Sequence, residues 1–247
     1  MPTAQICDIL FPYEQEVFFV AHALKICYRR LKPSDERQLI KFLYKQWQLP
    51  GSIPELSPEK LLARSYAYDL LRQQSRTYIA ETDGRIAGII MGRVYGASGA
   101  AGQASALHVS TTSHHGSAAA LKVSFRRALI QALMAVSQKG RDCRILLASL
   151  DQADHQLIHS YEGDFDGELV FFMVDRHLRG IGIGTSLLEL LHQYMRRQGV
   201  RRICVLTDTG CDYDYYDRHE FSRLKKQRVK LSSGRLEFTC YMYQYVY

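Results

Sequence analysis

Three glycines at alternate positions, Gly180, Gly182 and Gly184, separate an apolar run from an amphipathic one. Glycine leaves the neighbouring backbone N–H groups uncovered, and at the start of a helix those donors lack partners inside the helix. The helix dipole adds partial positive charge at the same place, so an anion is favoured there. The spacing therefore predicts a phosphate-binding turn. For the glycines alone, a tight turn that binds nothing is the open alternative.

A strand before the turn and a helix after it would hold these glycines in place. The run 169–174 is short, apolar and rich in β-branched and aromatic residues, as in a buried strand. After the turn, apolar side chains recur at helical spacing, among them Leu187, Leu191 and Met195. The sequence thus predicts a strand, a glycine turn and a helix in succession.

A dinucleotide site of the Rossmann type is the rival interpretation of the glycines. It needs G-x-G-x-x-G and an acidic residue after the next strand, a part that Asp208 could take. Thr185 stands where the third glycine would be, and too little chain follows Gly184 to complete a doubly wound sheet. The spacing therefore argues against a Rossmann fold.

Two segments resemble signatures of the GNAT N-acetyltransferase superfamily. Residues 179–184, Arg-Gly-Ile-Gly-Ile-Gly, are similar to its R-x-x-G-x-G signature, and residues 215–221, Tyr-Tyr-Asp-Arg-His-Glu-Phe, to its Phe-Tyr-x-x-x-Gly-Phe segment. The resemblance covers about residues 25–94 and 168–247. It implies an α+β fold, the GNAT (acyl-CoA N-acyltransferase) fold, with a mixed, mostly antiparallel sheet flanked by helices. It also implies that an acetyl group passes from acetyl-CoA to a primary amine of a small molecule or protein, by direct attack in a ternary complex.

The resemblance assigns acetyl-CoA binding to the turn and its neighbours. It implies that the pantetheine arm enters where the strand before the turn parts from the next strand, so that backbone N–H groups bind the thioester carbonyl. Thr209 stands where the family often has Asn, and Glu220 where it has Gly, so contacts near the fourth helix should differ. No metal is expected. The cofactor-binding residues implied are Phe172, Met173, Val174, Arg179, Gly180, Ile181, Gly182, Ile183, Gly184, Thr185, Thr209 and Tyr216.

Two side chains would carry the proton transfers. The resemblance implies that Tyr216 protonates the leaving thiolate, which a phenol of pKa about 10 can do at pH 7. It also implies that Glu168 is the general base. Val170 and Phe172, expected on the same strand face as Glu168, would raise the pKa of this carboxyl toward neutrality. For Glu168, the open alternatives are a water chain acting as base, an exposed residue at the strand start, or a carboxylate that binds the acceptor by charge alone. For Tyr216, the alternative is a ring that only packs in the core.

The chain departs from the family before the strand that begins at Glu168. We expect a single GNAT domain, residues 1–247, with an atypical insertion at residues 96–166, where the fourth core strand would normally follow soon. Its first part, 96–117, is rich in Gly, Ala, Ser and Thr and is expected to be mobile. Its role is left open.

Within the insertion, the pattern predicts a helix at 118–137 and a strand at 144–150. An apolar stripe formed by Leu121, Phe125, Leu129, Leu133 and Val136 would pack on the domain, with homodimer contact as the alternative. The acidic stretch 151–166 is expected to face water, and a rim that attracts a cationic amine is the alternative.

The remaining elements follow the family order. Strands are predicted at 25–30, 77–81, 85–94, 201–209, 222–230 and 236–247, and helices at about 33–48 and 58–71. Thr82-Asp83-Gly84 marks a hairpin. For residues 1–25 the sequence leaves an added strand and a short helix open.

The composition agrees with an enzyme that uses an anionic cofactor. The net charge of +7 fits a partner with several phosphate charges, and nucleic acid is not required. Six cysteines lack metal or disulfide spacing, and His108, His114 and His115 are expected to be exposed loop residues. Neither a signal peptide nor a membrane span is predicted, so a cytoplasmic location is expected. The alternatives to an enzyme are a catalytically silent acyl-CoA-binding regulatory module and an interaction role for the insertion.

Overall fold

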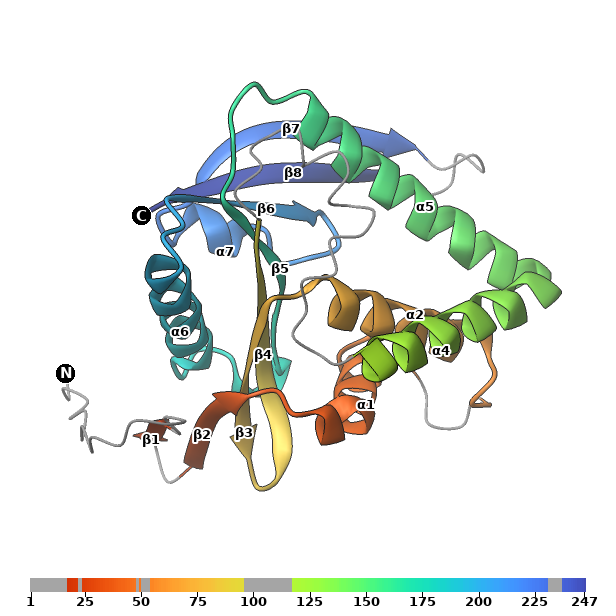
Figure 1. Ribbon diagram of the computed structural model, residues 1–247, viewed down its shortest axis with the longest axis horizontal. Coiled ribbons are helices and arrows are strands. Elements are labelled where there is room, and N and C mark those ends of the chain that lie inside the picture. The colour runs from red at the N-terminus through yellow and green to blue at the C-terminus, as the bar shows by residue number, and fades with distance from the viewer. Residues whose placement is uncertain (1–16, 22–23, 48, 50–53, 96–116, 231–236) are drawn as a thin grey trace.

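The computed structural model describes residues 17–21, 24–47, 49, 54–95, 117–230 and 237–247. They form one open sheet with helices on both faces (Figure 1). The prediction that His108, His114 and His115 are exposed loop residues falls outside the described residues. The alternatives for residues 1–16 also fall outside them. No helix in the described part of the chain is both long and apolar enough to cross a bilayer.

Eight strands make up the sheet, in the order β1-β2-β3-β4-β5-β6-β8-β7. Their bounds are β1 Val17–Ala21, β2 Leu24–Arg30, β3 Arg76–Thr82, β4 Arg85–Val94, β5 Gly167–Val174, β6 Arg202–Asp208, β7 Ser222–Lys230 and β8 Glu237–Val246. Only β5 and β6 run parallel, and every other neighbouring pair is antiparallel. The predicted mixed, mostly antiparallel α+β sheet is therefore confirmed. For residues 17–21 the strand alternative is correct, since β1 pairs with β2.

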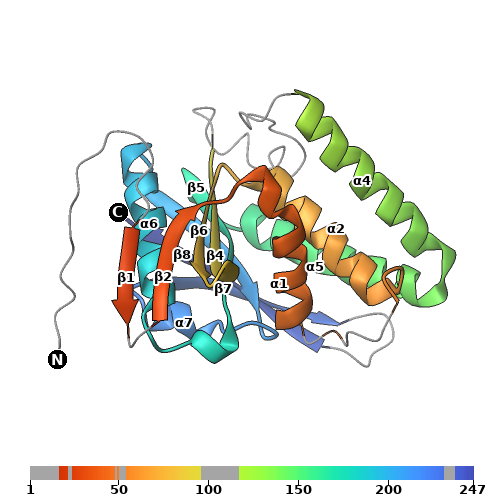
Figure 2. The same cartoon turned by 90° about the horizontal axis from the view of Figure 1, so that it is seen from below.

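The helices cover the two faces unequally. Helix α6 (Ile183–Arg197) lies on one face, whereas α1 (Glu36–Gln46) and α2 (Pro58–Gln73) lie on the other, and α4 (Ser117–Val136) and α5 (Gln138–His159) extend beyond them (Figure 2). Two short 3₁₀ turns, η1 (Pro33–Asp35) and η3 (Arg176–Leu178), and the one-turn α7 (Asp214–Asp217) complete the described elements. The layers follow from the apolar face that each helix must bury against the sheet or against another helix.

Local signals explain where several elements begin. Ser57 caps α2, because its side chain accepts a hydrogen bond from the Lys60 N–H at 3.4 Å. Asp83 and Gly84 both have positive φ, 48° and 69°, as a two-residue hairpin turn between β3 and β4 requires. The predictions for these elements are confirmed.

The predicted strand at 144–150 is wrong, because these residues lie inside α5. Ser137 starts that helix, since its side chain accepts a hydrogen bond from the Gly140 N–H at 3.0 Å. A seven-residue apolar run does not distinguish a strand from a buried helix segment. The leucines and alanine of this run are good helix formers, so a helix that has already begun continues through them.

The predicted packing face of α4 is also wrong. Ile130 and Met134 are buried, whereas the predicted stripe faces away from the domain, with Phe125 72% exposed and Val136 80% exposed. Leu129 and Leu133 are exposed as well, and nothing is described of the Leu121 side chain. The helix packs on α2 and α5 rather than on the sheet, so those contacts select its buried face.

Candidate functional site

The neighbouring parallel strands β5 and β6 part midway along their length. They pair only from Gly167 to Leu169 against Ile203 to Val205, although β5 continues to Val174 and β6 to Asp208. The other edge of β5 stays on β4. Backbone N–H and C=O groups on the β6 side of β5 beyond Leu169 are therefore free of that strand partner and can bind an extended ligand.

A bulge in β5 changes which side chains share a face. Met91 pairs with Phe171 and the next residue of β4 pairs with Leu169, so Val170 is the extra residue. As a result, Phe172 packs with the α6 side of the sheet and Val170 with the α1 and α2 side. The prediction that Val170 and Phe172 flank Glu168 on one face is wrong for this reason.

The glycine turn lies at the end of β5 and leads into α6. Gly180 and Gly182 have φ values of 82° and 91°, which other residues rarely adopt, and a Cβ added at either would meet no atom within 4 Å. Gly182 provides no side-chain cap, and the first backbone hydrogen bond across this end joins the Ser186 N–H to the Gly182 carbonyl at 3.0 Å. The N–H groups of the first turn of α6 are therefore available to an anion.

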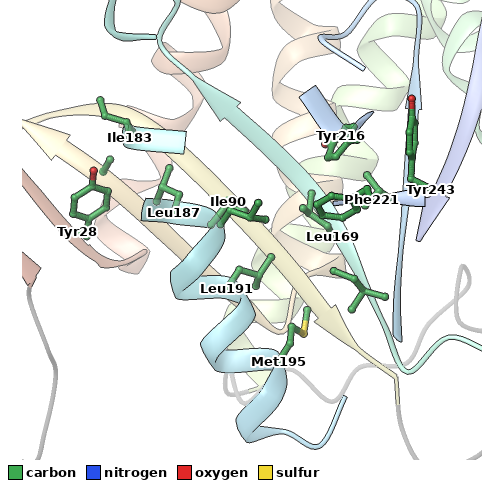
Figure 3. Close-up of a cluster of buried hydrophobic side chains, with 14 of the residues drawn as sticks. Tyr28, Ile90, Leu169, Ile183, Leu187, Leu191, Met195, Tyr216, Phe221 and Tyr243 are labelled. Carbon is green, nitrogen blue, oxygen red and sulfur yellow. The ribbon is translucent and has the colours of Figure 1, made fainter. Parts of the chain in front are cut away.

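A salt bridge and a packed helix fix this turn in position. Asp175, which is buried, forms an ion pair with Lys45 and accepts a hydrogen bond from the His177 N–H at 3.1 Å. The apolar face of α6 points onto the sheet, with Leu187 and Leu191 beside Ile90 (Figure 3). The position of the helix start is thus set by the core.

Arg179 remains largely in solvent beside the turn. Its Nε lies 3.5 Å from the Val174 carbonyl oxygen, and its Nη1 lies 3.7 Å from Asp212 Oδ2. Both contacts are long and more than half of the side chain is exposed. The guanidinium can therefore approach a phosphate group without losing a buried partner.

Tyr215 and Phe172 lie close to the start of α6. A Cβ added to Gly184 would lie 3.3 Å from Phe172 and 3.7 Å from the Tyr215 hydroxyl. The two rings meet edge to face, with centroids 5.2 Å apart. The Tyr215 hydroxyl is buried and has no hydrogen-bond partner among the described residues. A ligand that enters at this helix start would meet an unsatisfied donor.

Tyr216 is buried, with 7% of its surface exposed, and its ring packs against Phe221 and Tyr243 (Figure 3). No hydrogen bond to its hydroxyl occurs within the described part of the chain. Burial raises the pKa of Tyr216 well above its ordinary value of 10, and the nearby Cys211 and Tyr215 add to the rise. The phenol is therefore protonated at neutral pH, as a proton donor must be.

Glu168 is buried and paired. It forms an ion pair with Arg93 and accepts a hydrogen bond from the Tyr95 hydroxyl at 2.9 Å. Burial lowers the pKa of Arg93, but the charge and hydrogen bond of Glu168, together with the effects of Tyr95 and Cys204, outweigh burial, and the net change is upward. The carboxylate is therefore fixed in place by a guanidinium and a phenol hydroxyl.

Thr209, a predicted cofactor-binding residue, also forms hydrogen bonds at the end of the sheet. Its N–H donates to the Thr239 carbonyl at 3.0 Å, and its hydroxyl oxygen accepts from the Thr239 N–H at 3.2 Å. The hydroxyl hydrogen alone is left to donate to a pantetheine group. No group of three His, Cys, Asp or Glu side chains in the described ranges is arranged to hold a metal ion.

Sequence reasoning missed Arg93 and Tyr95. Arg93 pairs directly with Glu168 across the antiparallel strands β4 and β5. The pattern of β4 predicts which of its residues share a face, but only the register against β5 shows that Arg93 opposes Glu168. Because a long segment separates the two strands in the chain, their register cannot be predicted from the sequence.

Part of the sequence matches a known protein family. Residues 147–221 match the family described as the acetyltransferase (GNAT) family. No curated protein matches the sequence.

Solved structures of similar fold include three acetyltransferases. One, of the GNAT family from Desulfovibrio desulfuricans, has 15% identity over 90% of this chain and 98% of that chain, with a TM-score of 0.46. A polyamine N-acetyltransferase from Drosophila melanogaster has 16% identity over 90% of this chain and 100% of that chain, with a TM-score of 0.48. A streptothricin acetyltransferase from Bacillus anthracis, solved with acetyl coenzyme A, has 10% identity over 70% of this chain and 63% of that chain, with a TM-score of 0.38. Similarities this remote carry no argument about the acceptor.

Proposed function

We propose, from the premise that this chain is a member of the GNAT acetyltransferase superfamily, that it transfers an acetyl group from acetyl-CoA to a primary amine. The acceptor attacks the thioester directly in a ternary complex. One observation carries the proposal, namely that the uncapped start of α6 lies at the end of the strand that parts from β6, with a buried phenol nearby. A phosphate site, a thioester site and a proton donor then belong to one region.

The turn and the strand would bind the two ends of acetyl-CoA. The first-turn N–H groups of α6, with Gly180, Gly182 and the Arg179 guanidinium, supply donors for the pyrophosphate. Backbone groups of Phe172 to Val174 face no β6 partner and can bind the pantetheine arm and the thioester carbonyl oxygen. Hydrogen bonds to that oxygen stabilise the negative charge it gains in the tetrahedral intermediate.

The chemical step then needs two proton transfers. The neutral amine nitrogen forms a bond to the thioester carbon, and collapse of the tetrahedral intermediate breaks the C–S bond. Tyr216 gives its hydroxyl proton to the departing thiolate, which a phenol of raised pKa does only as negative charge develops on sulfur. The amide and the free thiol of CoA are the products.

The acceptor ammonium must lose a proton before it attacks. Glu168, held by its ion pair with Arg93, is the proposed acceptor of that proton. The proton reaches Glu168 directly or through water. Glu168→Gln should therefore flatten the rise of turnover with pH, and an unchanged profile would leave a water chain that does not end on this residue.

The experiment that tests the function is a calorimetric titration with acetyl-CoA, followed by an assay for thiol release with a panel of amines. Binding with release on at least one amine supports an acetyltransferase. Binding without release on any amine, including protein N-termini and lysine peptides, would support a catalytically silent acyl-CoA-binding module. Absence of binding would overturn the assignment of Arg179 to Thr185.

A further inference from the structure

The Tyr215 hydroxyl lies at the start of α6, among residues predicted to bind the cofactor. A Cβ added to Gly184 would lie 3.7 Å from this hydroxyl, 3.3 Å from the Phe172 ring and 3.7 Å from a methyl group of Val174. Phe172 and Val174 belong to the part of β5 that has no β6 partner. The hydroxyl therefore borders both the uncapped start of α6 and the parted end of β5.

Neighbouring groups hold the Tyr215 ring in this position. The ring stacks on His219, with centroids 3.8 Å apart and planes inclined by 14°, and it meets Phe172 edge to face. The His219 Nδ1–H donates to the Tyr215 carbonyl oxygen at 2.8 Å, which ties the imidazole to the same residue. The hydroxyl is thus presented by a packed ring, as a group that positions a ligand should be.

The hydroxyl has no partner in the free protein. Its oxygen is buried and makes no hydrogen bond within the described residues. Burial raises the pKa of Tyr215 to about 12, and the nearby charge of Arg218 opposes this rise only in part. The phenol is therefore protonated at neutral pH and able to donate. A buried donor without a partner costs free energy, and a hydrogen bond to a ligand would offset that cost.

This hydroxyl is a feature of the chain rather than of the motif. Tyr215 stands where the Phe-Tyr-x-x-x-Gly-Phe segment, which residues 215–221 resemble, has Phe. Thr209 stands where the family often has Asn, and its hydroxyl oxygen already accepts a hydrogen bond from the Thr239 N–H. The chain thus lacks a side-chain amide at the candidate site and has gained a phenol donor there.

We propose that the Tyr215 hydroxyl donates a hydrogen bond to a phosphate oxygen of acetyl-CoA bound at the start of α6. This inference rests on the proposed function. A phosphate is the group that the N–H donors of a helix start favour, and a hydrogen bond to a charged oxygen is stronger than one between neutral groups. Because the hydroxyl is covered in the free protein, the Phe172 ring turns aside as the ligand enters. The adjacent phenols Tyr215 and Tyr216 then divide cofactor binding from proton transfer.

The test is calorimetric titration of acetyl-CoA into the full-length wild type and Tyr215→Phe. This substitution removes only the hydroxyl and restores the residue of the motif. Tyr215→Phe should bind acetyl-CoA at least ten-fold more weakly. Tyr213→Phe is the matched control, because it removes the same group from a ring that stacks on Tyr241, with centroids 4.7 Å apart. It should change the affinity less than two-fold.

The stability of the free protein separates this role from a structural one. Because the hydroxyl has no partner there, Tyr215→Phe should leave the urea midpoint of the free protein unchanged or raise it. Acetyl-CoA should then raise the midpoint of wild type more than that of the variant at the same ligand concentration. A hydroxyl that only supports the fold would instead lower the midpoint of the free variant and leave the ligand-induced shift unchanged.

A fragment of the cofactor tests the assignment to phosphate. The compound 3′-phosphoadenosine 5′-diphosphate keeps the phosphates of CoA and lacks the pantetheine arm. Tyr215→Phe should weaken its binding by about the same factor as that of acetyl-CoA. A loss confined to acetyl-CoA would place the hydrogen bond on the pantetheine arm and overturn the proposal.

Equal acetyl-CoA affinity in wild type and Tyr215→Phe would also overturn it. That result leaves the proposed function intact, since the function fails only if wild type does not bind acetyl-CoA or if no amine releases thiol.

Discussion

Residues 167–221 and residues 117–159 differ in how much of their local geometry is set by residue types within the segment itself. In the first region, β5, the glycine turn and α6 follow one another, and the backbone of Gly180 and Gly182 sets the turn locally. In the second region, α4 and α5 are oriented by partners distant in sequence, such as Gln131 with Ser65. Local geometry can be read from residue types and spacing, whereas the choice of a buried helix face depends on which partner is present.

The same division separates the proposed reaction chemistry from stability. Residues 167–221 contain the proposed cofactor turn and Tyr216. A change in this first region should alter cofactor binding or turnover with any acceptor. A change in residues 117–159 should alter stability and leave acetyl-CoA binding intact.

The largest effect is expected from Tyr216→Phe. Loss of a general acid typically lowers turnover by about 10²–10⁴-fold, and we expect about 10³-fold here with little change in acetyl-CoA affinity. The measurement is steady-state thiol release together with calorimetric binding. Tyr245→Phe is the control, because this phenol lies in the aromatic cluster with His192 and Phe221 and should change turnover less than two-fold. Full activity of the Tyr216→Phe variant would mean that Tyr216 is not the general acid.

The next effect tests the corrected packing face of α4. Met134 is fully buried, so Met134→Ala should lower the free energy of unfolding by about 2–3 kcal/mol through lost burial and a cavity. Leu129 is half-exposed on the opposite face, and Leu129→Ala should cost less than about 0.5 kcal/mol. Urea denaturation of both variants is the measurement. A larger loss for Leu129→Ala would mean that the stripe of Phe125 to Val136 is covered in solution.

The two regions also differ in how much the sequence could predict. The strand, turn and helix of residues 167–198 were predicted because Leu187, Leu191 and Met195 repeat at helical spacing directly after the glycines. Residues 144–150 were predicted as a strand because a short apolar run carries no period of its own. Ser137, which begins α5, was interpreted as the end of the preceding helix instead. A capping serine is compatible with either role until the partner N–H is known.

The candidate site shows the same limit. The positions of the turn glycines and of Tyr216 follow from motifs, and their roles stay predictions. The contact of Arg93 with Glu168 depends on the register of β4 against β5. This register leaves no periodic signal in the chain. Residues far apart in sequence therefore carry the parts of the site that sequence reasoning missed.

A matched pair of glycines tests whether the turn acts through strain or through ligand binding. Gly182 and Gly84 both have positive φ, 91° and 69°, and a Cβ at either would meet no atom within 4 Å. Replacement by Ala should therefore lower the free energy of unfolding by a similar amount, about 1–2 kcal/mol, in both. Only Gly182→Ala should weaken acetyl-CoA binding, by about ten-fold, because its Cβ would occupy space beside the proposed phosphate site. Equal acetyl-CoA affinity in the two variants would contradict the phosphate-binding turn.

The last effect concerns the pH dependence of stability and again separates the regions. The pKa of Asp154 is about 8 in the folded protein against an ordinary value of 3.8, so between these values the folded state holds a proton that the unfolded state has lost. The stability linked to this proton is complete below pH 4 and is lost as pH rises through 8, with a slope of at most about 1.4 kcal/mol per pH unit. Asp154→Asn cannot ionise, so it should gain stability relative to wild type over this window.

Thermal or urea unfolding of wild type and Asp154→Asn at pH 5, 6, 7 and 8 measures that difference. Asp151→Asn should change the slope less than Asp154→Asn does, because Asp151 is exposed on the same helix and acts on the Asp154 pKa only through its charge. Parallel curves for wild type and Asp154→Asn would mean that Asp154 is not buried among acids.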